Sequence, residues 1–166
     1  MGCVFSKLFS FDLTKLVRSN DDIKEAVKMW MSDPEQAKIK YGDISQWDTS
    51  LVTDMNSLFY GSQFQGDISK WNVSSVTDMS FMFRRSRFQG NISAWNVSSV
   101  TDMSGMFSIS QFNGDISAWN VSSVTNMIFM FRRSRFQGNI SAWDVSSVTD
   151  MSCMFYGSQF QGDISA

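Results

Sequence analysis

The stretch FQGDISKWNVSSVTDMSFMFRRSR, residues 64–87, decides the fold, because near copies of it fill most of the chain. Glycine and isoleucine recur at a spacing of 24 residues, and so does tryptophan, at Trp47, Trp71, Trp95, Trp119 and Trp143. A fixed period in this range is typical of a solenoid, in which a single unit cannot bury its apolar face alone. The repeat begins near Lys40 and runs to the last residue, as five units and a partial sixth.

Each unit changes its periodicity along its length. Trp71 and Val73 alternate with a polar residue, which is the periodicity of a strand. Met79, Met82 and Phe83 follow at positions i, i+3 and i+4, which is helical periodicity. We therefore predict an α/β solenoid, a leucine-rich-repeat-like right-handed array of short parallel strands and short helical turns. An all-β solenoid is the alternative.

The residues before the array differ from it in composition. An apolar stripe at helical spacing predicts a helix that caps the first coil; its members are Ile23, Ala26, Val27 and Trp30. Ser19 or Asn20 can serve as its N-cap, and a second helix is predicted to begin at Ser32, with proline in its first turn. The domain prediction is a lead segment over residues 1–18, a helical N-cap over 19–39 and the array over 40–166.

The unit I-S-x-W-N-V-S-S-V-T-D-M-S-x-M-F resembles the repeats of the BspA-type leucine-rich-repeat surface-protein family. The resemblance covers residues 40–166, and the stretch before them resembles the helical lead-in that such arrays carry. What it implies is adhesion or binding to protein partners, and it implies no catalysis.

Composition narrows the function classes further. The net charge is −2, histidine is absent, and the only two cysteines are Cys3 and Cys153. These features favour no nucleic-acid partner and build neither a disulfide framework nor a Cys/His metal site. No acid, base and nucleophile converge outside the repeat pattern, so we expect no enzyme and no cofactor.

The first residues, MGCVFS, match the N-myristoylation pattern. We predict lipid attachment at Gly2 and Cys3, by myristoylation and palmitoylation, with Lys7, Lys15 and Arg18 as basic support. Two acyl chains anchor a protein stably, which places the chain at the cytoplasmic face of a membrane. A chance match on the terminus is the alternative, and the cell surface or secretion is the alternative location.

Two arginine clusters recur two units apart. They are Arg84, Arg85, Arg87, Arg132, Arg133 and Arg135. One interpretation is a patch for phosphate, anionic lipid or an acidic partner. The other is structural, a solvated face on which charges alternate between neighbouring coils and pair across them.

Other repeated polar columns have simpler interpretations. The N-x-S sequences that begin at Asn72, Asn91, Asn96, Asn120 and Asn139 are glycan acceptors in a secreted protein, but we expect them to form asparagine ladders. Asp78 and its equivalents are expected to cap the helical turns rather than to bind calcium. The threonine column around Thr77 raises ice or polymer binding as a remote alternative.

These observations predict a non-enzymatic protein-binding repeat module, tethered to a membrane through its acylated N-terminus. The alternative is an adhesion-type surface protein or a fragment of a longer array. Because the sequence ends in mid-unit at Ala166, without the polar cap that a solenoid needs, end-to-end self-association at this terminus is also expected.

Overall fold

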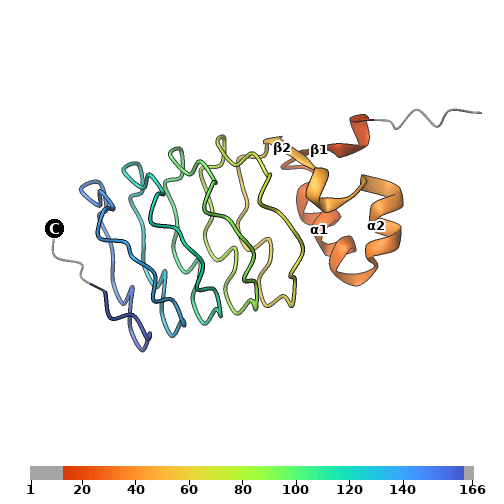
Figure 1. Ribbon diagram of the computed structural model, residues 1–166. Helices are drawn as coiled ribbons and strands as arrows, with labels where there is room; N and C mark the ends of the chain where they lie inside the picture. Colours follow the sequence, from red (N-terminus) through yellow and green to blue (C-terminus); the bar gives the residue numbers. More distant parts are fainter. Residues whose placement is uncertain (1–12, 163–166) are drawn as a thin grey trace, which may run out of the picture.

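A computed structural model describes residues 13–162, as a small helical part followed by a row of stacked coils (Figure 1). The elements in chain order are η1 (Leu13–Leu16), β1 (Val17–Ser19), α1 (Ile23–Ser32), α2 (Pro34–Tyr41), η2 (Ile44–Gln46) and β2 (Asp48–Leu51). β1 pairs in parallel with β2, so the segment before the helices extends the edge of the first coil. β1 thus crosses the boundary predicted after residue 18.

The helix α1 covers the start of the row. Ile23, Ala26 and Val27 are buried in the common core, and Trp30 packs against it, so the predicted apolar stripe is confirmed. The predicted caps are wrong by two or three positions for α1 and by one position for α2. Asp22 stands at the N-cap of α1, while the side chain of Asp33 accepts a hydrogen bond from Gln36 N at the start of α2. Proline does occupy the first turn of α2, as predicted, because its missing N–H has no partner to lose there.

The repeats form five coils of 24 residues, over residues 40–63, 64–87, 88–111, 112–135 and 136–159, which we number 1 to 5. Backbone hydrogen bonds join each coil to the next at a constant offset. In coil 2 the N–H groups of Met79, Phe81, Phe83 and Arg85 donate to carbonyl oxygens of coil 3, at N···O distances of 3.0, 2.8, 3.0 and 2.9 Å. The same pattern recurs in coils 1, 3 and 4, so the coils lie side by side in one row.

The predicted helical turns are not helices. Between these inter-coil donors, Met82 N donates to Met79 O and Arg84 N to Phe81 O, which closes a chain of tight turns. Phe81 and Arg85 have φ angles of +57° and +59°, in the left-handed region that no α-helix contains. Because every second N–H is committed to the next coil, the i→i−4 bonds of a helix cannot form.

The predicted strand position is also wrong. Parallel bridges join Asp54, Asp78, Asp102, Asn126 and Asp150 from coil to coil, whereas Trp71 and Val73 lie in no strand. Asp78 caps a turn rather than a helix, because its carboxylate accepts from Ser80 N at 2.8 Å. Asn72 and Asn91 likewise accept from the N–H two residues on, at 3.1 and 3.0 Å. The N-x-S sequences therefore form Asx-turns within a coil, and not the expected ladders between coils.

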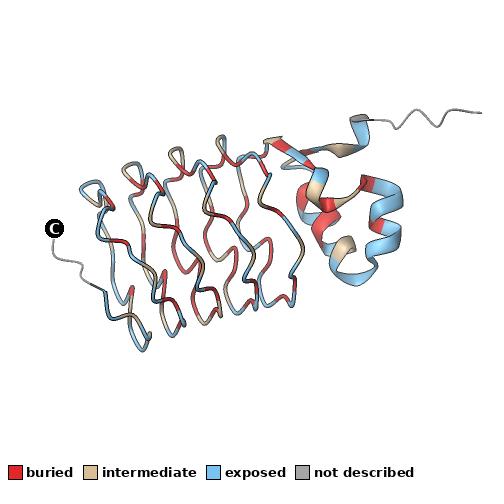
Figure 2. Ribbon diagram, viewed as in Figure 1, coloured by how far each residue is buried: buried red, intermediate tan, exposed pale blue. Residues whose placement is uncertain are grey.

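Columns of equivalent apolar residues form one continuous core inside the row (Figure 2). One column stacks Phe59, Phe83, Phe107, Phe131 and Phe155, with centroids of neighbouring rings 5.4 to 5.7 Å apart and planes within 8° of parallel. Such offset stacking adds favourable contact beyond simple burial. Each coil thus buries its apolar face against its neighbours, as the repeat predicts.

Tryptophan joins the coils by a polar contact as well. The indole N–H of Trp95 donates to the carbonyl of Ile68 in the preceding coil at 3.1 Å, and Trp71, Trp119 and Trp143 make the equivalent bond. Buried polar groups cost free energy unless they are paired, so the indole requires this acceptor. The spacing of tryptophan and isoleucine therefore encodes the stacking of coils.

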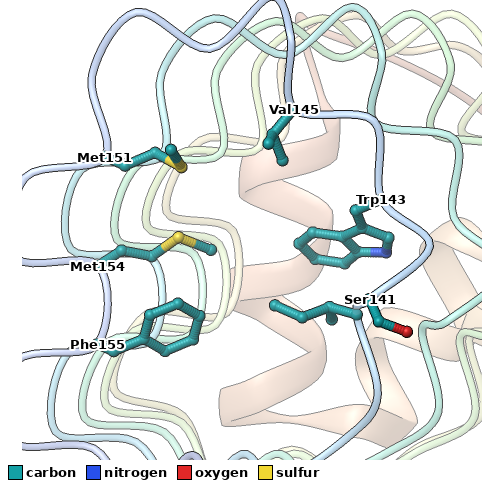
Figure 3. A pocket seen from close by; sticks show the side chains of 7 residues that line it. Ser141, Trp143, Val145, Met151, Met154 and Phe155 are labelled. Atoms are coloured by element: carbon teal, nitrogen blue, oxygen red, sulfur yellow. The ribbon is translucent and has the colours of Figure 1, made fainter. Parts of the chain in front are cut away.

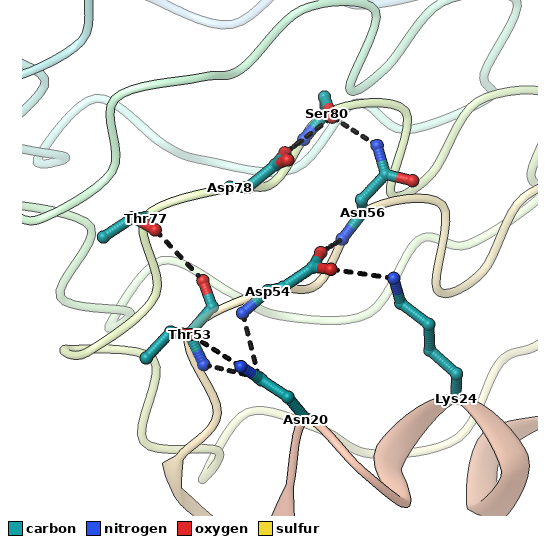
Figure 4. A network of polar contacts seen from close by, with 8 residues as sticks. All are labelled: Asn20, Lys24, Thr53, Asp54, Asn56, Thr77, Asp78 and Ser80. Atoms are coloured by element: carbon teal, nitrogen blue, oxygen red, sulfur yellow. Dashed lines mark hydrogen bonds and ion pairs between the residues drawn. The ribbon is translucent and has the colours of Figure 1, made fainter.

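The helical part is fixed to coil 1 by a polar network (Figure 4). The side-chain oxygen of Asn20 accepts from Thr53 N and Asp54 N at 2.9 and 3.1 Å, and Lys24 Nζ lies 2.9 Å from Asp54 Oδ2. Asn20 thus supplies to coil 1 the hydrogen-bond acceptor that a preceding coil would supply, and it does not cap α1. Arg18 is only 3% exposed and lies against the rings of Tyr41 and Trp47, and this burial lowers its pKa. Arg18 is therefore unavailable as basic support for a membrane.

Candidate functional site

The strongest candidate site is a surface that combines arginine with aromatic rings. We call it the arginine–aromatic face and define it by Tyr60, Phe81, Arg84, Arg85, Arg87, Phe129, Arg132, Arg133, Arg135 and Tyr156. All six arginines predicted as partner-binding residues belong to it. Arg84 and Arg132 are half-buried, whereas the other four are exposed.

Aromatic rings hold two of the guanidinium groups. Arg84 Cζ lies 5.4 Å from the ring centroid of Phe81 and 5.9 Å from that of Tyr60. Arg132 Cζ lies 5.5 Å from Phe129 and 5.6 Å from Tyr156. Cations at these distances are attracted to the ring faces. Each pair of rings restricts the arginine side chain, which lowers the conformational entropy that the side chain loses when it binds a partner.

The backbone beneath the face is under strain that glycine would relieve. One left-handed column contains Ser57, Phe81, Gly105, Phe129 and Cys153, and a second contains Gly61, Arg85, Ile109, Arg133 and Gly157. A left-handed conformation costs a residue with a side chain about 1–2 kcal/mol, and it is a marked outlier for a bulky one. Coils 2 and 4 nevertheless place phenylalanine and arginine there. Coils 1, 3 and 5 each have glycine in one of the two columns, so of the five coils only coils 2 and 4 accept this cost in both, and their larger side chains point to a role at the surface.

The arginines have no acidic partner in the part of the chain that the structure describes. The four ion pairs found among residues 13–162 all lie in the N-terminal part and coil 1 and involve Arg18, Lys24, Lys38 and Lys40. The pairing across coils that the structural interpretation expects is therefore not seen there. Arg84 Nε is also buried without an acceptor among the described residues. Within residues 13–162, the positive charge of these arginines is therefore not neutralised by ion pairs.

Gly105 positions one ring of the face. A Cβ atom at Gly105 would lie 2.5 Å from the nearest ring carbons of Phe81, so the ring occupies the space above this glycine in coil 3. Gly105 also has a φ angle of +58°. Glycine is required here both by its backbone conformation and by the ring that covers it.

The aromatic members of the face were not predicted from the sequence. The sequence contained the signal, because Tyr60, Arg84, Arg132 and Tyr156 stand in one column at multiples of 24 residues. Tyr60 and Tyr156 are 46% and 59% exposed. Exposed aromatic rings thus accompany the arginines on this face.

A second candidate is an apolar pocket of about 80 Å³ in coil 5 (Figure 3). It is lined by Ile140, Ser141, Trp143, Val145, Met151, Met154 and Phe155. In each preceding coil the next coil covers the corresponding columns; Phe131, for example, is buried under Phe155. The pocket is therefore the continuation of the core at this edge of the row.

Other predictions concern features away from the arginine–aromatic face. Gly2 and Cys3 lie outside the described residues. Among residues 13–162, no helix has the length and apolar character to cross a bilayer, and no cluster of acidic, cysteine or histidine side chains is suited to a metal ion. The hydroxyl of Thr77 donates to Thr53 O at 3.3 Å, and the equivalent threonines of coils 3 to 5 make the same bond.

The carboxylates of the array serve its turns. Hydrogen bonds from the side chain and the backbone of Ser69 lower the pKa of Asp67, and those from Ser146 lower the pKa of Asp144. Both carboxylates are fully exposed and accept from the N–H two residues on. They stabilise turns in their ionised form and are not placed for proton transfer.

The stacked 24-residue coils define a repeat protein. Within this class, a family model described as "Mycoplasma protein of unknown function, DUF285" matches the chain over residues 12–131 and again over 85–166. The chain belongs to this family. No curated protein and no solved structure matches it.

Proposed function

We propose that the protein is a non-enzymatic protein-binding repeat module and that the arginine–aromatic face is its partner-binding surface. One observation carries the proposal: coils 2 and 4 place phenylalanine and arginine at left-handed positions where glycine costs least. The neighbouring Arg84 and Arg132 are stacked on aromatic rings, and neither has an acidic partner among the described residues. Tyrosine and arginine are the residues most enriched where binding energy concentrates in protein interfaces.

Site-specific photo-crosslinking in the source cell tests this proposal. A benzoylphenylalanine replaces Phe129 on the face or, as the control, Leu51, which is more exposed but lies on β2. We expect discrete protein adducts from position 129 that disappear in the Arg84→Gln/Arg132→Gln background, and none from position 51. Equal adducts from both positions, or none from position 129, would contradict the proposal.

The fold class is part of the proposal. The constant offset of the inter-coil hydrogen bonds supports a solenoid, and the repeat resembles the leucine-rich-repeat type of the BspA-like surface proteins. The stacked coils give it a continuous side surface, on which such proteins bind partners.

We further propose that acylation at Gly2 and Cys3 tethers the module to the cytoplasmic face of a membrane. The support is the MGCVFS start, which fits the myristoylation pattern with an adjacent cysteine. Labelling with a clickable myristate analogue in a cell that has the transferase tests this: Gly2→Ala should abolish incorporation. If the wild-type protein takes up no label, the tether is refuted.

The second candidate is an adhesion-type surface protein, favoured by the resemblance to the BspA-type repeats. Antibody labelling of intact, unpermeabilised cells separates it from the tethered module, because only a surface protein is stained. Ice or polymer binding through the threonine column has less support, since the column's hydroxyl groups donate to backbone carbonyls of the neighbouring coil. A thermal-hysteresis measurement decides it.

A further inference from the structure

The two halves of the arginine–aromatic face mirror each other across coil 3. From coil 1 to coil 5, one column contains Tyr60, Arg84, Ser108, Arg132 and Tyr156. Arg84 is held against the tyrosine of coil 1, whereas Arg132 is held against the tyrosine of coil 5. Between them the column contains only the small, buried Ser108. The face therefore presents two equivalent cationic sites at a fixed separation.

The separation follows from the stacking of coils. Neighbouring strands lie about 4.8 Å apart, so two coils place the clusters about 10 Å apart. The phenylalanine column agrees, with centroid steps of 5.7 Å from Phe83 to Phe107 and from Phe107 to Phe131. A partner that uses both sites must carry anionic groups at this spacing and on one side.

Resting on the proposed function, we infer that the face binds one acidic polypeptide segment in the polyproline II conformation, lying along the row of coils. This conformation rises about 3.1 Å per residue and repeats every three residues, so side chains at i and i+3 share one side about 9 Å apart. A β-strand fits less well, because its residues i and i+3 point to opposite faces.

The chemistry of the face fits the same segment. A guanidinium group donates a planar pair of N–H groups to a carboxylate, which the stacking of Arg84 and Arg132 orients in advance. Exposed aromatic rings are the surfaces on which proline-rich segments dock, and Tyr60, Phe129 and Tyr156 supply them beside the arginines. A fluid membrane does not hold its anionic groups at a fixed spacing, so we favour the peptide over a lipid surface.

Two peptides of identical composition test the inference. EPPEPPE places its glutamates at every third residue, whereas EEEPPPP carries the same charge and prolines in the wrong register. Each is labelled with fluorescein and titrated with the full chain, with fluorescence anisotropy for affinity and calorimetry for stoichiometry. We expect EPPEPPE to bind one per chain and about tenfold more tightly than EEEPPPP, the gain of one further charged hydrogen-bonded contact.

Single-cluster variants provide the matched controls. Arg84→Gln and Arg132→Gln should each lower the affinity for EPPEPPE about tenfold, to that for EEEPPPP, because either change leaves only one site. Gln111→Ala, at a half-buried residue of coil 3 outside the face, is the neutral control, and urea midpoints confirm that each variant is folded. Equal affinities for the two peptides, or two peptides bound per chain, overturn the inference.

The remaining outcomes separate this inference from the function on which it rests. If neither peptide binds while crosslinks from position 129 persist, the acidic segment is refuted and the protein-binding function stands. If the crosslinks are absent as well, both fail. Sedimentation with phosphatidylcholine vesicles that contain phosphatidylserine gives the last arm: arginine-dependent binding to vesicles but not to EPPEPPE overturns the inference in favour of a membrane.

Discussion

Replacing Gly105 with alanine tests the contact that shapes the arginine–aromatic face. The new Cβ would lie 2.5 Å from the Phe81 ring, and the residue would keep a φ angle of +58°. Gly61 provides a matched control in coil 1. Its φ angle is +67°, but a Cβ there meets no heavy atom within 4 Å.

The two substitutions share one cost and differ in another. A side chain in the left-handed region costs about 1–2 kcal/mol, which applies to both glycines. Overpacking against a neighbouring ring costs a further 1–3 kcal/mol, roughly, and applies to Gly105 alone. We therefore expect Gly61→Ala to lower the free energy of unfolding by about 1–2 kcal/mol and Gly105→Ala by about 2–5 kcal/mol.

Urea unfolding followed by tryptophan fluorescence and by circular dichroism measures the difference. Coincident transitions from the two probes and an unchanged m-value are required before the free energies are compared. Phe81→Ser completes the design, because Ser57 occupies this column in coil 1. In the Phe81→Ser background, Gly105→Ala should cost no more than Gly61→Ala. Equal costs in the wild-type background, or a difference that survives the removal of Phe81, would refute the reasoning.

Three further predictions concern the array and its cap. Trp95→Phe should lower the free energy of unfolding by about 1–3 kcal/mol, through the lost hydrogen bond to Ile68 O and the cavity left behind; a loss below about 0.5 kcal/mol in urea unfolding would contradict this. The array should lose stability in acid, because folding lowers the pKa of Asp67, Asp115 and Asp144. Their ionised carboxylates stabilise the folded state fully above the unfolded pKa of about 3.9, and this stabilisation is lost as the pH falls through the folded pKa. Replacing Asp67, Asp115 and Asp144 with asparagine, which other coils use in these columns, should flatten that pH profile, and an unchanged profile would show that other groups dominate. Deleting residues 1–39 should expose coil 1 and cause aggregation in light scattering; a folded, monomeric truncated array would disprove the capping role of the helices.

The sequence predicts the core well and the backbone of each coil poorly. Columns such as Trp71 and Val73 are recognisable because burial in every coil imposes the same residue every 24 positions. The spacing of Met79, Met82 and Phe83 matches a helix equally well, because local periodicity does not show that alternate N–H groups bond to the next coil. Left-handed φ angles at Phe81 and Arg85 are unforeseeable from residues that normally avoid them.

The candidate site was also predicted only in part, because the sequence of one coil does not show which residues of the next coil it meets. The six arginines stood out as departures from the repeat, and the structure places Arg84 and Arg132 against aromatic rings. Their aromatic neighbours were missed because Tyr60 and Phe81 belong to different coils and different columns. Only the stacking of coil 1 on coil 2 brings both rings close to Arg84.

Because the same hydrogen bonds join every pair of neighbouring coils, each coil adds the same length to the row. Coil 3 lies between the two arginine coils as a spacer, and it is joined to both by the same set of bonds that joins every other pair. Duplication or loss of one 24-residue unit at this point would change the distance between the clusters by about 4.8 Å and leave their chemistry intact. A change in the number of coils would therefore alter the spacing of the two proposed contacts without changing the residues that make either one.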